Sequence, residues 1–256
     1  SQRVIIHGKK DVIGVMGCKP IHIMTPEERG KNLKLGDYFV DLGMTKGQVK
    51  KIIKVGDPIT RRSELLELGN CVNVKSLDNR VSVFVLLEAL RAIKKSRHKP
   101  AYDFYAVFTV QEEVGLRGAN VSALEIQPDF GFGLDTTIAF DTPGAQPQER
   151  CTSLGKGAGI KIMDSSAICD YRMVAYMKKT ADTKKIKWQP EILAAGGTDT
   201  ASLQRMNPGG SIAGAISIPT RHIHQSIEMS DKSDIEACIK LLAACVCGLD
   251  KGDWKF

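Results

Sequence analysis

The fold and the chemistry of this chain are both indicated by the stretch Gln111-Glu112-Glu113-Val114-Gly115-Leu116-Arg117-Gly118. The apolar run that precedes it, Phe104 to Val110, is typical of a buried β-strand. Open α/β sheets place their sites where such strands end. Because neighbours on extended backbone face opposite ways, one glutamate can bind a metal ion while the other acts as a general base toward bound water. An acidic surface turn is the alternative, and a Glu-Glu pair alone does not exclude it.

Other ligand-type side chains occupy the same kind of position in the sequence. Each follows a strand-like run: Asp78 after Cys71–Leu77, Asp135 after Phe130–Leu134, and His224 shortly after Ser211–Ile218. With Glu113 they form a set of carboxylates and imidazole without cysteine, which suits Zn, Co or Mn. Since a carboxylate can bridge two ions ~3.5–4 Å apart, the set is able to hold a dinuclear centre.

Each candidate ligand also has an ordinary structural interpretation. Asp78 precedes a predicted helix from Val81 to Ile93 and can serve as its N-cap. Asp135 can begin an Asx-turn, and His224 can be an exposed loop histidine. One shared site explains all of these residues together, so we favour it.

The motifs around these residues resemble the M42 metallo-aminopeptidases, the group of glutamyl and tetrahedral aminopeptidases. They occur in the family's order and extend over most of the chain. The matching segments are Ser76-Leu77-Asp78-Asn79-Arg80, Thr109–Ala119, Leu134-Asp135-Thr136-Thr137, Gly196-Gly197-Thr198-Asp199 and Pro219–His224. The resemblance implies an enzyme, a metal-dependent aminopeptidase that acts on short peptides.

The resemblance also implies a role for each site residue. Asp78 would bridge two divalent ions per subunit, Glu113 and His224 would hold one ion, and Asp135 would help to hold the other. Glu112 would be the general base. The family's small β-rich dimerisation domain further implies a homo-oligomer, with a dodecamer as one form.

One family feature is not found in this sequence. Members carry an earlier His-x-Asp motif, whose histidine completes the Asp135 metal site. Only His7 and His22 precede Asp78, and neither is followed by x-Asp. We therefore expect that the chain begins partway through the family pattern and that an upstream segment supplies this histidine. An inactive scaffold subunit and a related metal-dependent amidase or deacylase are the alternatives. His222 stands where the family often has an aromatic residue, and we expect it to support the site without binding metal.

The chain is predicted to fold as two domains. Residues 1–70 contain short β runs broken by glycine and proline and are assigned to the dimerisation or oligomerisation domain. Residues 71–256 alternate strand-like and helical segments, which predicts a zinc-peptidase-like α/β sheet with flanking helices as the catalytic domain. The last helix is expected to begin at a capping box, Ser233-x-x-Glu236.

A glycine turn, Gly196-Gly197-Thr198-Asp199, precedes a predicted helix over Thr200–Met206. Thr198 or Asp199 can cap that helix. The exposed amides at its start can also hold a peptide carbonyl or carboxylate. Gly197, Thr198 and Asp199 are therefore the predicted substrate-binding residues.

Composition favours a globular enzyme and excludes several other classes. Hydrophobic residues make up 43% of the chain and charged residues 25%, as in ordinary globular proteins. The sequence has no apolar run near the ~20 residues of a membrane span. The formal charge of +7 comes from dispersed lysines without a nucleic-acid motif, so we expect no nucleic-acid partner. Seven cysteines, an odd number without C-x-x-C spacing, favour the reducing cytoplasm.

Overall fold

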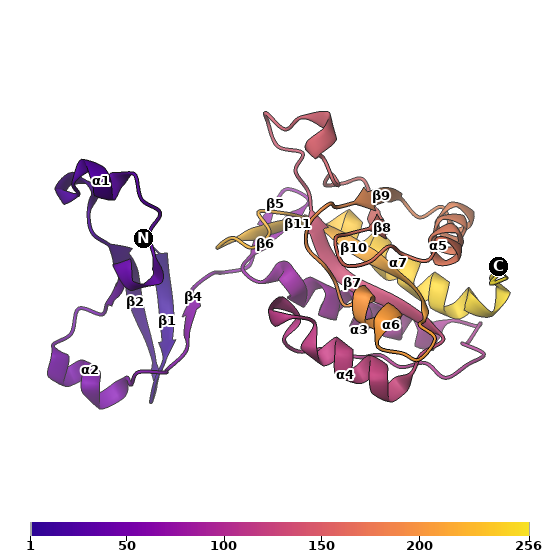
Figure 1. The fold of residues 1–256 in the computed structure, drawn as a ribbon, viewed down its shortest axis with the longest axis horizontal. Coiled ribbons are helices and arrows are strands. Elements are labelled where there is room, and N and C mark those ends of the chain that lie inside the picture. The colour runs from indigo at the N-terminus through magenta and orange to yellow at the C-terminus, as the bar shows by residue number, and fades with distance from the viewer. Residues whose placement is uncertain (1, 256) are drawn as a thin grey trace. The chain divides into compact units, whose positions relative to one another are not determined.

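Residues 2–255 are described by a computed structural model, and they divide into two units between Glu64 and Leu65. The sequence had placed this division at residue 70. Strand β5 (Leu66–Leu68) pairs with β6 (Cys71–Val74), so the residues just after Glu64 belong to the larger sheet. Figure 1 draws the strands and helices of both units.

The first unit is a four-stranded antiparallel sheet with the order β3-β2-β1-β4. Its elements are β1 (Gln2–His7), β2 (Asp11–Cys18), β3 (Tyr38–Asp41), β4 (Ile59–Arg61), α1 (Pro26–Arg29) and α2 (Lys46–Ile52). Along β2 the side chains alternate, with Val12 buried and Ile13 51% exposed. The alternation follows from the period of two in a strand, and it leaves one face of this sheet apolar and open to water.

His7 lies in this small sheet, where both of its ring nitrogens have partners. Nδ1 lies 2.9 Å from Asp11 Oδ1, and Nε2 lies 2.9 Å from Thr60 Oγ1. Its side chain is therefore engaged within the first unit.

The second unit contains a seven-stranded sheet with helices on both faces. The strand order is β5-β6-β11-β10-β8-β9, and β7 pairs with β10 in parallel. The remaining strands are β7 (Phe130–Ile138), β8 (Ala158–Met163), β9 (Trp188–Ile192), β10 (Ile212–Arg221) and β11 (Glu228–Asp231). The helices are α3 (Leu77–Lys95), α4 (Arg117–Ile126), α5 (Tyr171–Lys184), α6 (Thr200–Arg205) and α7 (Lys232–Gly248).

The two faces of the larger sheet differ in character. One face buries the apolar core against α3, α5 and α7, with Ile160, Ile216 and Met173 fully buried in it. The opposite face carries α6. A Cβ at Gly133 on β7 would lie only 2.1 Å from Thr200 Oγ1, so glycine is needed for this close approach. Because strand residues alternate, Asp135 shares the α6 face with Gly133.

Three expectations about the positions of strands and helices are wrong. The run Phe104–Val110 is irregular backbone that pairs with no described strand, and Tyr105 and Val110 are 61% and 69% exposed. Composition favoured a buried strand there, but strand formation needs a neighbour. Asp135 lies within β7 and not after it. Helix α7 is capped by Asp231, whose side chain accepts a hydrogen bond from the amide of Ser233, so Ser233 is not the cap.

Within the described residues, no helix is long and apolar enough to cross a membrane.

Candidate metal centre

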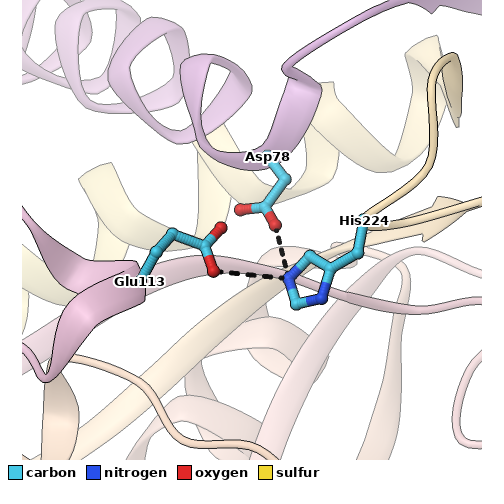
Figure 2. A group of neighbouring side chains, drawn as sticks. All are labelled: Asp78, Glu113 and His224. Carbon is cyan, nitrogen blue, oxygen red and sulfur yellow. Dashed lines mark ion pairs between the residues drawn. The ribbon is translucent and has the colours of Figure 1, made fainter. Parts of the chain in front are cut away.

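Three of the predicted ligands come together at one point of the second unit. Asp78, Glu113 and His224 each offer a ligand atom, and these atoms all lie within 4.8 Å of one another. His224 Nε2 is 3.1 Å from Asp78 Oδ2 and 3.7 Å from Glu113 Oε2. Figure 2 shows the three side chains pointing toward one another from the start of α3, the turn before α4 and the loop after β10. Two carboxylates and an imidazole form a donor set that fits a divalent transition metal.

Glu228 positions two of these ligands, and the sequence analysis did not identify it. This residue is buried at the start of β11. Its carboxylate accepts hydrogen bonds from the backbone amides of Asp78 (2.9 Å) and His224 (3.3 Å). Burial raises the pKa of Glu228, and the nearby charge of Asp78 raises it further. One buried carboxylate therefore connects the segments that carry two of the three ligands.

Glu112 and Glu113 occupy a single turn of 3-10 helix, Glu112–Val114, and not the extended backbone that the sequence suggested. The turn still separates their side chains, since Glu113 joins the group of three and Glu112 does not. Glu112 is half-buried, and its pKa is raised to about 7. Burial is the main cause, and the negative charges of Asp199, Glu113 and Asp78 add to it. A carboxyl group with a pKa near neutrality is suited to accept and return a proton.

Asp135 is buried on β7 and lies outside the group of three. Its Oδ1 accepts a hydrogen bond of 2.8 Å from the amide of Thr136. Burial raises the pKa of Asp135 well above its usual range, and the charges of Asp78 and Glu112 also raise it. These charge effects place Asp135 in the same electrostatic neighbourhood as the predicted ligands.

The predicted substrate loop borders the same region. Asp199 stands at the N-cap position of α6, but its side chain does not cap the helix. Instead Asp199 Oδ2 accepts a hydrogen bond of 2.6 Å from Thr109 Oγ1, and its charge contributes to the raised pKa of Glu112. Thr198 is buried and donates to Asp164. Gly197 packs so closely on Ser166 that a Cβ would lie 2.4 Å from Ser166 Oγ.

Left-handed backbone is concentrated around the three ligands. Among residues 2–255, seven non-glycine residues have positive φ, and five of them lie within three positions of a predicted ligand. These five are Ser76, Gln111, Leu116, His222 and His224. His222, with φ of 60°, lies in a turn, and its side chain is exposed. Left-handed conformations cost energy for residues with a Cβ, and they are common at functional sites.

The fold and the site together define a class of protein, an α/β protein with a carboxylate–histidine group beside its sheet that fits a divalent metal ion. Residues 1–241 match the M42 glutamyl aminopeptidase family. The chain therefore belongs to the M42 family, whose members are peptide-bond hydrolases.

Several solved structures share this fold, and two of the three that follow are named aminopeptidases. Aminopeptidase APDkam598 from the archaeon Desulfurococcus kamchatkensis is 37% identical, with a TM-score of 0.88 over 96% of this chain and 68% of its own. The TET aminopeptidase from a marine sediment Thaumarchaeota archaeon is 36% identical, with a TM-score of 0.90 over 96% and 69%. The PhTET1-12s structure, a dodecamer, is 27% identical, with a TM-score of 0.80 over 96% and 71%. The chain spans about two thirds of the length of each.

Proposed function

We propose that this protein is a dinuclear metal-dependent aminopeptidase that removes N-terminal residues from short peptides. The observation that carries the proposal is the meeting of Asp78, Glu113 and His224 within 4.8 Å, beside a half-buried Glu112 whose pKa is about 7. Named aminopeptidases among the similar structures support the same activity.

The residues divide into ligands and a base. Asp78, Glu113 and His224 would hold one ion, and Asp135 with Asp78 would help to hold the second. Zn, Co and Mn all suit this donor set. Bound ions would lower the pKa of a water molecule and stabilise the negative charge that develops on the scissile carbonyl oxygen. Glu112 would take the proton of that water at its carboxylate and return it to the leaving amine.

The substrate loop would select a free peptide N-terminus. The charge of Asp199 acts strongly enough near Glu112 to raise its pKa, and the same charge would attract an ammonium group. The backbone of Gly197 and Thr198 would hold a peptide carbonyl group. An N-acylated peptide lacks the ammonium charge and would lose this attraction.

A paired substrate panel tests the proposal. Aminoacyl p-nitroanilides and short peptides would be assayed with the amino group free and with it acetylated, before and after removal of metal with a chelator. We expect release only from the free-amine substrates, loss of turnover on chelation, and recovery with Zn, Co or Mn. Preference for the acetylated substrates would identify an amidase or deacylase. Absence of both turnover and bound metal would identify a scaffold subunit.

We further propose that residues 1–70 mediate self-association, with a dodecamer as the candidate assembly. The open apolar face of the first unit, which includes Ile13, Val15 and Phe39, supports an interface there. The dodecamer of PhTET1-12s supports this form of assembly. The cytoplasmic location inferred from the cysteine usage stays a prediction.

A further inference from the structure

A buried charge network lies on the α6 face of the larger sheet, outside the metal-ligand group. Its charged members are Lys161 on β8, Glu191 on β9 and Asp164 just after β8. Lys161 Nζ is 2.5 Å from Glu191 Oε1 and 3.5 Å from Asp164 Oδ2. Lys161 is only 1% exposed, and both carboxylates are equally buried. We call these three residues the Lys161 network.

Burying charged groups costs free energy, so a contribution to folding stability does not explain why these charged residues are present. Replacing a buried ion pair by apolar groups of similar volume is often neutral or stabilising. Burial alone would lower the pKa of Lys161, but the charge and hydrogen bond of Glu191 outweigh burial and raise it. Glu191 Oε2 is buried without a hydrogen-bond partner among residues 2–255. These features indicate a role beyond packing.

On one side the network holds the substrate loop. Asp164 Oδ2 accepts a hydrogen bond of 3.3 Å from Thr198 Oγ1. Asp164 Oδ1 accepts three more bonds of 2.8 Å, from the amide and hydroxyl of Ser166 and the amide of Ala167. The amide of Ser165 in turn donates to Gly196 O at 3.2 Å. Asp164 therefore orders the turn on which Gly196–Asp199 rests.

On the other side the network contacts the strand that carries Asp135. Glu191 Oε1 accepts a hydrogen bond of 2.7 Å from Thr137 Oγ1 as well as the bond from Lys161. Thr137 follows Asp135 by two residues on β7, so both side chains lie on the same face. Lys161 thus joins β7 and the Gly196–Asp199 loop through two buried carboxylates.

We propose that Lys161 is a positioning residue that fixes the Gly196–Asp199 loop relative to β7. The loop would then hold the substrate in the correct position relative to the metal centre. The proposal rests on the proposed aminopeptidase function. Lys161 is buried, so we place it away from direct contact with substrate. Its effect on substrate passes through Asp164 to Thr198.

The test compares three variants in the full chain with its metal. The double variant Lys161→Met/Glu191→Met removes both charges of the ion pair together. Thr198→Val removes only the hydroxyl group that donates to Asp164. Misplacement of a binding group by ~1 Å costs on the order of 100-fold. We expect each variant to lose roughly 10- to 100-fold in kcat/KM, mainly through KM. The triple variant should lose less than about 3-fold more kcat/KM than the more impaired of these two variants, because all three substitutions interrupt the same connection.

Hydrogen exchange provides a second readout that does not require turnover. We expect the amides of residues 193–199 to exchange at least about 10-fold faster in Lys161→Met/Glu191→Met than in the parent chain. Met177→Ala, a fully buried change on α5, is the control for lost stability and should leave KM and this exchange unchanged. If the double variant keeps both parental KM and parental exchange, or if Met177→Ala alters KM equally, Lys161 is not a positioning residue. A parent protein that holds two metal ions per chain and still shows no peptidase activity would refute the proposed function, whereas the exchange result would still decide whether Lys161 holds the loop.

Discussion

The substitution Glu112→Gln tests the division of labour at the candidate metal centre. Gln has the size of Glu but cannot accept a proton, and Glu112 is not among the three clustered ligands. The change should therefore remove the base and leave the ligands in place. Since the pKa of Glu112 is about 7, Gln resembles the protonated form that the metal-free chain already populates at neutral pH. We expect no loss of folding stability.

The expected loss of turnover follows from the role of a general base. Removal of such a group costs ~10²–10⁴-fold, which corresponds to about 3–5 kcal/mol of barrier height. Metal affinity should change little, because both carboxylates and the imidazole of the ligand group are retained. The loss should appear in kcat, since a proton transfer acts in the transition state and not in substrate binding.

The assay is hydrolysis of an aminoacyl p-nitroanilide by metal-loaded protein, with metal content measured on the same samples. Glu125→Gln, an exposed change on α4, is the matched control and should keep parental turnover. If Glu112→Gln retains turnover within about 10-fold of the parent with stoichiometric metal, Glu112 is not the base. If it loses metal, Glu112 is a ligand and the assignment of roles must be revised.

Three further perturbations test other parts of the structure. His224→Ala should weaken zinc binding by roughly 100-fold or more in calorimetric titration, because outer partners of metal ligands alone account for ~10–100-fold, and unchanged affinity would exclude His224 as a ligand. Asp234 is fully buried and accepts bonds from the amides of Gly155 and Gly157, and burial raises its pKa from 3.8 to about 6. The folded protein therefore binds a proton at Asp234 more tightly than the unfolded chain does. This proton stabilises the folded state by up to about 3 kcal/mol below about pH 4, and the contribution is lost as the pH rises through about 6. Asp234→Asn should flatten this part of the pH dependence of urea unfolding, and equal slopes would contradict the assignment. Ile13→Glu should lower the mass of the assembly in light scattering while Lys50→Glu does not, and an unchanged mass for both would count against the apolar face as the interface.

The sequence was most informative about features that are encoded in short local motifs. Asp78, Glu113 and His224 were predicted to share a site, and their ligand atoms do meet. The α/β alternation after residue 70 likewise predicted a sheet with flanking helices, and the second unit contains one. These features depend on residue type and short-range periodicity, which a single sequence displays directly.

The sequence was least informative where structure depends on distant partners. Glu228 is a single glutamate between Ile227 and Met229, and its role arises only when β11 brings it under Asp78, 150 residues away in sequence. The run Phe104–Val110 has the composition of a strand, but pairing is set by neighbours that composition does not specify. The Lys161 network was missed for the same reason, because its members come from two strands and a loop.

The left-handed residues around the metal centre bear on how this chain can evolve. Glycine adopts their conformation without strain, so replacing Gln111 or Leu116 by glycine would relieve on the order of 1 kcal/mol of backbone strain each. The same replacement would let the turn that carries Glu112 and Glu113 sample many more conformations. At His224 the relief would also remove a ligand. Selection for heat resistance and selection for turnover would therefore favour different residues at these positions. Sequences optimised for stability alone would be expected to lose catalytic activity.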